Sequence, residues 1–376
     1  MMTIGFDAKR AFKNFSGLGN YSRSMIRALA QYYPGNRYVL YTPPFEPHPA
    51  LNELAHIDVT IRTPKGAGAW SPSLWRMGGL GFPAALQEEG VQVFHGLSGE
   101  LPYHTLPSLK MVVTMHDVIF MRYPEYYSAI DRFLYEKKFR HACRRADKII
   151  AISQQTKDDL IQFFEVDHSK ITVIYQGCDT QFTHKPPPDV CAAIRAKYRL
   201  PEQYILSVGT IEERKNLVTI MKALAMLPSS LHIVALGRST SYMDQVRREI
   251  ERHCLASRVH FIHDALFSDF PALYANARAL VYPSLFEGFG IPVLEGLTAG
   301  IPVITSNISS MPEAGGDAAL YIHPLDAKEI AHAILSVIED RSLAEGMVER
   351  GFKHALRFRD EEIASMLHRL YTQLIS

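Results

Sequence analysis

Residues 279–300 read ALVYPSLFEGFGIPVLEGLTAG, and this stretch predicts a strand, a glycine loop and a helix in succession. Its first four residues form an apolar run, which is typical of a strand covered on both faces of a parallel sheet. Gly288 and Gly290 leave backbone amides free to approach a ligand. Pro292 suits the first turn of a helix, so we expect the helix to begin near Ile291. Because ligands of open parallel sheets bind beyond the carboxyl ends of the strands, this loop is a candidate site.

The same alternation of short apolar runs with helix-length amphipathic segments continues along almost the whole chain. Helices between such strands imply right-handed βαβ units and parallel sheets. Eleven strands are many for one open sheet, so we divide them between two sheets. The predicted strands are Thr3–Ala8, Arg37–Thr42, Val91–Gly96, Met111–His116, Lys148–Ile152, Ile171–Tyr175, Tyr204–Val208, Leu231–Leu236, Arg258–Ile262, Ala279–Pro283 and Pro302–Thr305.

The division falls at residues 178–189, which read CDTQFTHKPPPD. Three consecutive prolines cannot continue a helix or a central strand, and they suit a semi-rigid linker. At about 150 residues per domain, 376 residues also favour two domains. We therefore expect an α/β protein with two doubly wound, Rossmann-like parallel-sheet domains, 1–178 and 179–359, facing each other across a cleft. The segment 361–375 carries apolar residues at helical spacing.

The composition excludes several classes of protein. Apolar residues make up 47% and charged residues 21%, which is too apolar for a disordered chain. Since 40 basic side chains face 39 acidic ones, there is no global field to attract nucleic acid, and we expect no such partner. The four cysteines show no Cys-x-x-Cys pair and fit a reducing compartment. No apolar run approaches about 18 residues, and the N-terminus MMTIGFDAKR resembles no signal peptide, so we expect a cytoplasmic protein.

A second loop, GTIEERKNL, follows the predicted strand Tyr204–Val208 and places Arg214 beside Lys215. The pair lies just before a helix that Asn216 is expected to cap. An arginine and a lysine at a helix N-terminus make a clamp for a diphosphate, because the helix dipole adds to both charges. The alternative is a solvated turn in which the two preceding glutamates balance the cations.

Two carboxylates accompany the 279–300 loop. Glu287 precedes the predicted helix and Glu295 lies eight residues further, in its first or second turn. Both can face the cleft, where carboxylates accept hydrogen bonds from vicinal sugar hydroxyls. The alternative makes Glu295 a partner of the helix dipole and Glu287 an ordinary surface residue.

With these loops in place, the sequence resembles the family 4 retaining glycosyltransferases, which have the GT-B fold, and in particular mannosyltransferase-like members. EGFGIPVLE (287–295) matches that family's Glu-x7-Glu signature. In the family's Asn-Gly-Val-Asp hinge, this chain departs at Gln176 and Cys178. The resemblance covers essentially the whole chain through SGLGNYS (16–22), TMHDVIFMRYPEYYS (114–128), AISQQTKDDL (151–160), VIYQGCDT (173–180), GTIEERKNL (209–217) and SNISSMPEAGGDAALYIHPLD (306–326).

The resemblance implies a donor site in the second domain and a C-terminal helix, 360–376, that returns to the first. It assigns Arg214 and Lys215 to the diphosphate, Glu287 and the amides of Gly288, Phe289 and Gly290 to the donor sugar, Glu295 to the ribose, and Arg238 with residues 263–266 to the nucleobase.

In the first domain the resemblance implies that His116 lies against the donor sugar, with Gly17 and Gly19 near its phosphates. Asp117 would contact the acceptor or the donor. From the residues alone, His116 ends an apolar strand where a cleft is expected, and the alternative is a histidine that only orders the loop. SGLGNYS approaches a dinucleotide fingerprint, but the loop 8–17 is too long for that tight turn. We therefore discount a nicotinamide site.

Two patches bear on the acceptor. Residues 64–83 hold both tryptophans, Trp70 and Trp75, among glycines, and predict an acceptor platform, a membrane-dipping loop or a packed loop. Residues 137–148 are basic near one helical face, which suits docking on anionic lipid or simple solvation.

These observations predict a retaining hexosyltransferase that is cytoplasmic or peripheral on the inner face of the membrane. Its donor would be a nucleotide-sugar, GDP-mannose or a UDP-sugar, and its acceptor a glycan or a lipid-linked glycan of a cell-surface polysaccharide or glycolipid. No Asp-x-Asp occurs in the chain, so we expect no metal and no other cofactor. The alternatives are a two-lobed sugar-binding protein without catalysis, and a GT-B-type phosphorylase or epimerase.

Overall fold

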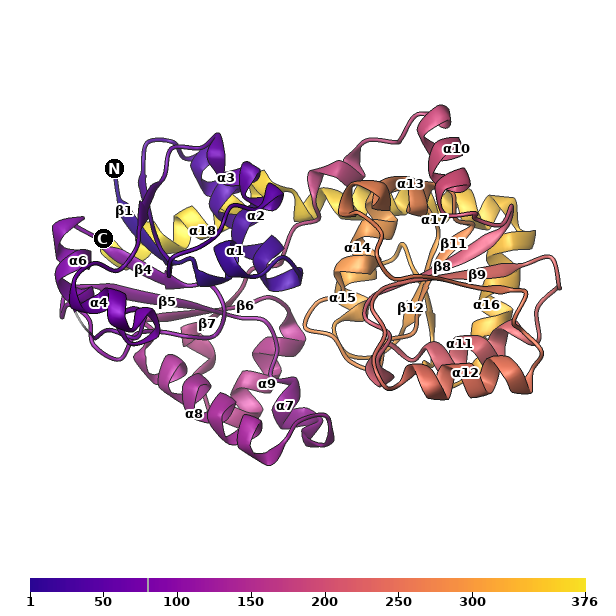
Figure 1. Cartoon of the computed structure of the whole chain (residues 1–376), viewed down its shortest axis with the longest axis horizontal. Helices are drawn as coiled ribbons and strands as arrows, with labels where there is room; N and C mark the ends of the chain where they lie inside the picture. Colours follow the sequence, from indigo (N-terminus) through magenta and orange to yellow (C-terminus); the bar gives the residue numbers. More distant parts are fainter. Residues whose placement is uncertain (80) are drawn as a thin grey trace. The chain divides into compact units, whose positions relative to one another are not determined.

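The computed structural model describes residues 1–79 and 81–376, except for the side chain of residue 67. The chain forms two compact units (Figure 1). Unit 1 comprises residues 1–177 and 358–376, and unit 2 comprises residues 178–357.

Unit 1 is built on a seven-stranded sheet with the strand order β3-β2-β1-β4-β5-β6-β7. Neighbouring strands pair in parallel throughout this order. The strands are β1 (Thr3–Asp7), β2 (Arg37–Tyr41), β3 (Thr60–Arg62), β4 (Val93–Gly96), β5 (Lys110–Met115), β6 (Lys148–Ala151) and β7 (Ile171–Val173).

Helices cover both faces of this sheet, with α2 and α18 on one side and α8 and α9 on the other (Figure 1). Alternate residues of a strand point to opposite faces. In β4, Phe94 packs with the core beneath α8 and α9, whereas His95 reaches α18. The helices of unit 1 are α1 (Lys9–Lys13), α2 (Gly17–Tyr32), α3 (Asn52–Ala55), α4 (Ala67–Trp70), α5 (Pro72–Arg76), α6 (Phe82–Glu88), α7 (Ile119–Arg122), α8 (Ala129–Arg145), α9 (Gln154–Phe164) and α18 (Asp360–Ile375).

Unit 2 repeats the design with a six-stranded parallel sheet of order β10-β9-β8-β11-β12-β13. Its strands are β8 (Tyr204–Val208), β9 (His232–Leu236), β10 (Val259–Ile262), β11 (Ala279–Tyr282), β12 (Val303–Ser306) and β13 (Leu320–Ile322). Its helices are α10 (Pro188–Lys197), α11 (Leu217–Leu224), α12 (Met243–Arg252), α13 (Phe270–Ala275), α14 (Ile291–Thr298), α15 (Met311–Gly315), α16 (Ala327–Glu339) and α17 (Arg341–Ala355).

Two Rossmann-like parallel sheets are therefore confirmed as the fold class. All eleven predicted strands are present, and the structure adds β3 and β13, which the sequence analysis missed. Both are three-residue strands at the edge of a sheet. Each pairs with one neighbouring strand, and neither contains an apolar run long enough to be recognised in the sequence. The helix predicted to begin near Ile291 begins at that residue.

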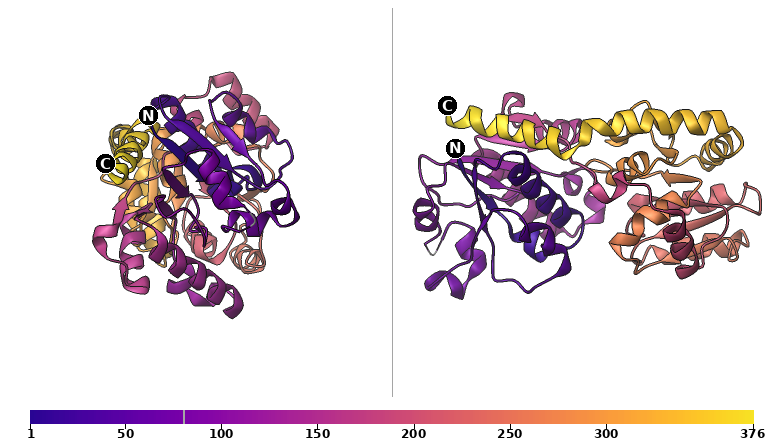
Figure 2. Two further views of the ribbon diagram at one scale, coloured as in Figure 1. Left: turned by 90° about the vertical axis from the view of Figure 1, so that its left-hand side faces the viewer. Right: turned by 90° about the horizontal axis from the view of Figure 1, so that it is seen from above.

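The chain returns to unit 1 at residue 358, and α18 lies along α2 (Figure 2). The apolar stripe of α18 is buried, and Asp360 in its first turn accepts a hydrogen bond from Arg27 of α2 at 3.0 Å. Tyr371 joins a fully buried chain of hydrogen bonds. Its hydroxyl lies 2.6 Å from His95 Nδ1, and His95 Nε2 lies 2.8 Å from Thr114 Oγ1. Burial lowers the pKa of His95 to about 3, so the ring is neutral and each nitrogen needs its one partner.

Replacing Tyr371 by phenylalanine is expected to destabilise unit 1 by about 1–3 kcal/mol, because it leaves a buried imidazole nitrogen without a partner at almost unchanged volume. Both tryptophans lie in unit 1, so their fluorescence during urea unfolding reports on this unit. Tyr32→Phe, at a side chain 39% exposed, is the matched control and should change stability by no more than about 0.5 kcal/mol. Equal midpoints for the two variants would contradict the role given to this hydrogen bond.

Candidate active site

In unit 2, the predicted donor residues gather at the carboxyl ends of β8 and β11. Arg214 and Lys215 lie in a 3₁₀ turn, Glu213–Lys215, after β8, and Glu287 lies in the loop after β11. A backbone hydrogen bond from the Leu285 amide to the Arg214 carbonyl, 2.8 Å long, ties the two loops together. Residues 72 positions apart in the sequence are thereby brought into contact.

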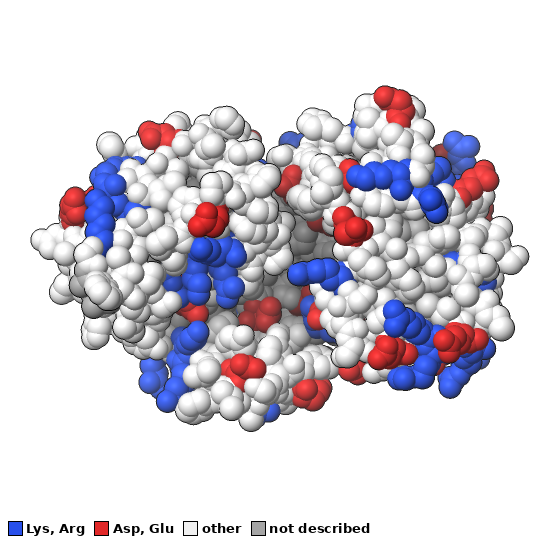
Figure 3. All heavy atoms as spheres, in the orientation of Figure 1, with Lys and Arg blue, Asp and Glu red and all other residues white. Residues whose placement is uncertain are grey.

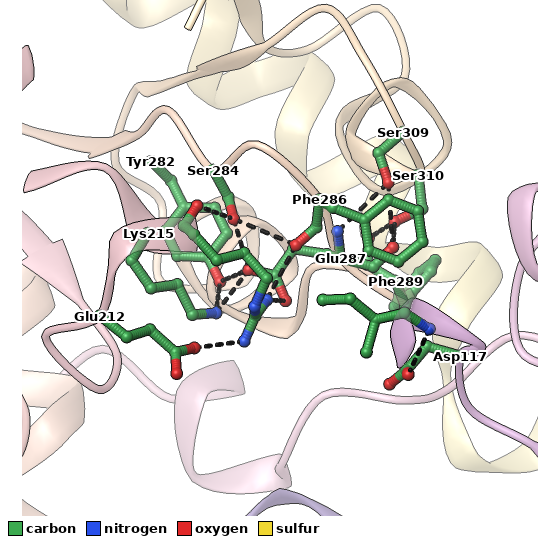
Figure 4. A network of polar contacts seen from close by, with 12 residues as sticks. Asp117, Glu212, Lys215, Tyr282, Ser284, Phe286, Glu287, Phe289, Ser309 and Ser310 are labelled. Carbon is green, nitrogen blue, oxygen red and sulfur yellow. Dashed lines mark hydrogen bonds and ion pairs between the residues drawn. The ribbon is translucent and has the colours of Figure 1, made fainter. Parts of the chain in front are cut away.

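The carboxylate of Glu287 is the centre of this cluster (Figure 4). Lys215 Nζ donates to its Oε1 at 2.5 Å, and Arg214 Nη1 lies 2.5 Å from its Oε2. The hydroxyls of Tyr282 and Ser284 also donate to Oε1, at 2.8 and 2.6 Å. Burial opposes ionisation of Glu287, but the two cations outweigh it and hold the pKa at about 2. Glu287 is therefore an ionised, buried carboxylate and not an ordinary surface residue.

The cations themselves are also largely buried, with 21% of the Arg214 side chain and 15% of the Lys215 side chain exposed. This excludes the alternative of a solvated turn. Glu212 does balance Arg214, at 2.5 Å, as that alternative expected. Burial lowers the pKa of Lys215, and the nearby Glu287 partly offsets the effect.

Asn216 does not cap the following helix, which corrects the sequence-based expectation. It adopts a left-handed conformation, with φ +60°, and its side chain makes no capping hydrogen bond. Its amide instead donates to the carbonyls of Pro283 and Pro324, at 3.2 and 2.6 Å. The residue therefore links the β8 loop to the loops after β11 and β13, because its side chain bonds to these carbonyls and not to the backbone amides of the helix.

Glu295 is buried in the second turn of α14, and the first turn contains no acidic residue. Because the effect of the helix dipole falls off within the first turn, this position disfavours the alternative that makes Glu295 a partner of the dipole. Its Oε2 accepts a hydrogen bond from the Tyr274 hydroxyl at 2.5 Å. Burial raises the pKa of Glu295 to about 7, and the repulsion from Asp179 adds to this. The two glutamates of the signature thus ionise in different pH ranges.

Glycine is required where the loops approach each other. Gly290, the residue before α14, has φ +112°, and a Cβ there would lie 2.6 Å from the Met311 side chain. Gly237, at the end of β9, has φ +154°, and a Cβ would lie 1.9 Å from the Gly209 carbonyl oxygen. The expected amide donors Gly288 and Phe289 lie between Glu287 and Gly290, and the carbonyls of Glu287 and Phe289 are held by Ser310 at 2.9 Å.

The expected nucleobase residues lie at the end of the neighbouring strands. Arg238 follows β9 and is exposed. Residues 263–266 follow β10, and His263 Nδ1 lies 2.8 Å from the Gly237 carbonyl. The contact joins the two loops, and the assignment of a nucleobase to them stays a prediction.

In unit 1, His116 directly follows β5. Its Nε2 donates to the Leu97 carbonyl at 2.9 Å, and the edge of the ring meets Tyr21 at a centroid distance of 4.5 Å. Burial lowers the pKa of His116 to about 4, so the ring is neutral near pH 7 and Nδ1 is its acceptor nitrogen. Asp117 Oδ1 accepts from the Ile119 amide at 3.1 Å. His116 is thus fitted to accept a hydrogen bond rather than to donate a proton.

The glycine loop of unit 1 opens α2. A Cβ at Gly19 would lie 1.6 Å from the Asn14 carbonyl oxygen, whereas a Cβ at Gly17 would meet nothing within 4 Å. Asn14 Oδ1 accepts from the amides of Ser16 and Gly19, at 2.9 and 3.3 Å, and so caps the helix. Asn14 was not predicted as a functional or capping residue, although an asparagine before a glycine-rich helix start is a capping signal.

The residues around the predicted ones were also missed. Thr114 lies in β5, two residues before His116, and is hydrogen-bonded to Tyr21 at 3.1 Å and to His95. A polar residue inside an apolar strand, as at His95 and Thr114, is the sequence signal that would have indicated a buried network. In unit 2 the residues that were not predicted are Tyr282 and Ser284, whose hydroxyls donate hydrogen bonds to Glu287.

The two tryptophans separate into two environments. Trp75 is buried, with its ring 5.0 Å from that of Phe82, as the packed-loop alternative expected. Trp70 is 92% exposed. Within the 64–83 stretch, residue 80 lies outside the described residues.

Residues 137–145 of the basic segment form the second half of α8, whereas Lys148 begins β6. Several of the cations on α8 are paired. Lys138 lies 3.1 Å from Glu100 and Arg140 lies 2.8 Å from Glu136. The first half of α8 exposes Ile130, Phe133 and Leu134. On the face shown in Figure 3, basic and acidic side chains lie interspersed, in keeping with a net charge of +1.

Two absences hold for residues 1–79 and 81–376, the described part of the chain. In that part of the chain, no three or more His, Cys, Asp or Glu side chains lie together in a way that would hold a metal ion. None of the helices in the same part is long and apolar enough to cross a membrane.

Comparison with known proteins gives two family matches that together span most of the chain. Residues 192–354 match the model described as glycosyl transferases group 1, and residues 15–182 match glycosyltransferase family 4. O-antigen chain mannosyltransferase B of Escherichia coli is 32% identical over 296 residues, which cover 77% of this chain and 76% of that protein. O-antigen chain mannosyltransferase RfbU of Salmonella typhimurium is 30% identical over 237 residues, covering 62% and 63%.

Among solved structures, Anabaena Alr3699/HepE in complex with UDP and glucose has a TM-score of 0.77 at 19% identity, covering 99% of this chain and 100% of that one. WaaG, a glycosyltransferase involved in lipopolysaccharide biosynthesis, has a TM-score of 0.69 at 18% identity, covering 99% and 100%. At these identities the likeness shows the fold alone.

The diphosphate clamp predicts that Arg214→Ala with Lys215→Ala weakens nucleoside diphosphate binding by about tenfold or more, because charge-assisted contacts are lost. The double variant also leaves Glu287 buried without a counter-charge, which is expected to cost stability of about 3–5 kcal/mol. Adding Glu287→Gln should therefore restore thermal stability without restoring affinity.

Calorimetric titration with GDP and UDP measures the affinity. Arg247→Ala with Arg248→Ala, two exposed arginines of α12, is the control. Full affinity in the triple variant would refute the clamp.

The pKa of Glu295 predicts how donor binding depends on pH. The ionised carboxylate is the better acceptor for two ribose hydroxyls, so nucleotide-sugar affinity should rise from pH 6 to pH 8, by about tenfold for a pKa of about 7. Glu295→Gln should bind with a flat pH profile. A wild-type profile as flat as that of the variant would show that Glu295 does not contact the donor.

Proposed function

The chain belongs to glycosyltransferase family 4 and is a glycosyltransferase, and from this premise we propose that it transfers mannose from GDP-mannose to a glycan with retention at the anomeric carbon. The observation that carries the proposal is the cluster of Arg214, Lys215 and Glu287 at the carboxyl ends of β8 and β11. The choice of mannose is supported by the two relatives named O-antigen chain mannosyltransferases. A UDP-sugar is the second donor to test.

The reaction breaks the bond between the anomeric carbon and the diphosphate oxygen, and negative charge accumulates on the leaving diphosphate. We propose that Arg214 and Lys215 stabilise that charge, and the contacts that hold both side chains in position support this role. The amides at Gly288, Phe289 and Gly290 and the carboxylate of Glu287 are proposed to bind the sugar hydroxyls. Glu295 is proposed to bind the ribose.

Retention is proposed to come from attack on the face that the leaving group vacates. The acceptor hydroxyl forms the new bond to the anomeric carbon, and its proton passes to the departing phosphate oxygen. Glu287 is engaged on both oxygens by cations, so it is poorly suited to act as a covalent nucleophile. Neutral His116, with Gly17, Gly19 and Asp117, is proposed to support the sugar and phosphates by hydrogen bonds and not by proton donation.

We propose that no metal takes part. The two protein cations supply positive charge of the kind that a divalent ion supplies in enzymes with an Asp-x-Asp motif, which this sequence lacks. Neither a non-catalytic sugar-binding protein nor a phosphorylase or epimerase finds support among the relatives reported above.

The acceptor is proposed to be a glycan of a cell-surface polysaccharide, carried on a lipid and reached from the cytoplasmic side of the membrane. Support comes from the first half of α8, where Ile130 is 73% and Phe133 55% exposed, next to the basic second half. An apolar and basic surface of this kind suits contact with anionic lipid.

The activity assay uses the full chain with GDP-mannose or a UDP-sugar, an oligomannoside acceptor and excess EDTA. We expect GDP release that depends on the acceptor, and a product whose new linkage has the anomeric configuration of the donor sugar by NMR.

Vesicles containing anionic lipid should speed transfer to a lipid-linked acceptor, and neutral vesicles should not. Loss of activity in EDTA with rescue by magnesium or manganese would contradict metal independence. An inverted linkage would contradict retention.

A further inference from the structure

Tyr21 of α2 packs against the ring of His116 in unit 1. The two ring centroids are 4.5 Å apart and the ring planes are almost perpendicular, at 88°. Aromatic rings prefer this edge-to-face arrangement, which stabilises one relative position of the pair. Tyr21 is buried and is not among the residues proposed above to contact the donor. Its direct neighbour in the proposed site is therefore His116.

Two other contacts restrain His116. Its Nε2 donates to the Leu97 carbonyl at 2.9 Å, and its own carbonyl accepts from the Thr156 hydroxyl at 3.1 Å. The first contact fixes one nitrogen of the ring and the second fixes the backbone. The torsion about the Cβ–Cγ bond of histidine is broad, so a packed surface is needed to hold the plane of the ring. Tyr21 supplies such a surface and thereby helps to direct Nδ1, the acceptor nitrogen.

A series of buried hydrogen bonds holds the Tyr21 ring. The Tyr21 hydroxyl lies 3.1 Å from Thr114 Oγ1 in β5, and Thr114 Oγ1 lies 2.8 Å from His95 Nε2 in β4. The series ends in α18, where the Tyr371 hydroxyl lies 2.6 Å from His95 Nδ1. Thr114 is central, because its hydroxyl has one proton and two lone pairs and can serve both neighbours. The C-terminal helix is thus connected to the residue that packs on His116.

Polar side chains are an unfavourable way to fill this volume. Thr114 and His95 are 0% exposed, and burial raises the pKa of Tyr21 above its usual range. Apolar side chains of similar size would occupy the same space without losing hydration. A network in which each member is hydrogen-bonded instead specifies one arrangement, because rotating a member leaves a buried polar group unpaired. Turning Tyr21 away from His116 would break its bond to Thr114.

The backbone that carries Tyr21 is fixed by separate contacts. Arg23, two residues further along α2, is buried and donates to the carbonyls of Ala11 and Asn14, at 2.9 and 3.0 Å. Gly19 lies so close to Asn14 that a Cβ would collide with the carbonyl oxygen of that residue. Loss of the hydroxyl contact of Tyr21 therefore frees its side chain and leaves the start of α2 in place.

We propose that Tyr21 is a positioning residue for His116. Thr114 and His95 hold Tyr21 in place, and Tyr371 of α18 anchors the series. Tyr21 acts by keeping the His116 ring in one orientation, with Nδ1 available to the donor sugar. It neither touches the donor nor transfers a proton. The inference rests on the proposed function, because it uses the donor contact assigned to His116.

The test compares Thr114→Val, which removes the hydroxyl at similar shape, with Thr114→Ser, which keeps it. In the transfer assay with GDP-mannose and an oligomannoside, Thr114→Val should lower kcat by about two- to tenfold, the range that corresponds to the loss of one aromatic pair. Thr114→Ser should stay within about twofold of wild type, because a hydroxyl can still serve both neighbours. GDP affinity should be unchanged in both variants, since the proposed diphosphate clamp lies in unit 2.

NMR of isotope-labelled histidine reads the orientation directly, with the His116 signals assigned by their loss in His116→Gln. The wild type should show a single neutral form with the proton on Nε2. Thr114→Val should add a form with the proton on Nδ1, or an average of the two, whereas Thr114→Ser should not.

Tyr41→Phe is the matched control. It removes a buried hydroxyl that donates to the Ala85 carbonyl at 3.2 Å, on the opposite face of the same sheet. It should alter neither kcat nor the His116 signals.

An unchanged kcat or unchanged His116 signals in Thr114→Val would overturn the proposal. So would an equal loss of kcat in Tyr41→Phe, because the network would then act only through stability. Failure of the proposed function is distinguishable: the wild type would transfer no mannose, yet the His116 signals would still respond to Thr114→Val and not to Tyr41→Phe. If Thr114→Val fails to fold, Tyr21→Phe replaces it, since it breaks the same hydrogen bond and leaves His95 its bond to Thr114.

Discussion

The proposed donor site of this glycosyltransferase depends on one buried carboxylate, Glu287, held between Lys215 and Arg214. Removing three charges from water is costly, and the arrangement persists because each charge has a partner of opposite sign and further hydrogen bonds. The carboxylate joins the β8 loop to the β11 loop, with Asn216 adding a second link. The cations are therefore fixed before any ligand binds, which is the property that the proposed diphosphate clamp requires.

The two carboxylates of the Glu-x7-Glu segment have opposite environments. Glu287 contacts two cations and has a pKa of about 2. Glu295 is buried, accepts a hydrogen bond from the hydroxyl of Tyr274, and has a pKa of about 7. Environments that separate the pKa values of neighbouring groups are a feature of functional sites. Glu287 accordingly stays ionised across the physiological pH range, whereas the charge of Glu295 changes within that range.

Much of the fold and part of the site could be predicted from local patterns. Apolar runs of four or more residues identify the strands that are covered on both faces, and the proline after Ile291 places the start of α14. Local patterns were insufficient for β3 and β13, because an edge strand of three residues is decided by its neighbour. They were misleading for Asn216, since a side chain that is a good cap in isolation found two carbonyls from distant loops.

The sequence by itself determined the two α/β units, the loops that carry chemistry and the residue types available at each, because these follow from periodicity and from turn-forming residues close together in the chain. Only the tertiary structure decided that Lys215 pairs with Glu287, that His116 is a neutral acceptor, and that Thr114 links Tyr21 to His95. Such contacts join residues tens of positions apart. Their pKa values and partners depend on burial and charge in three dimensions, which no local pattern encodes.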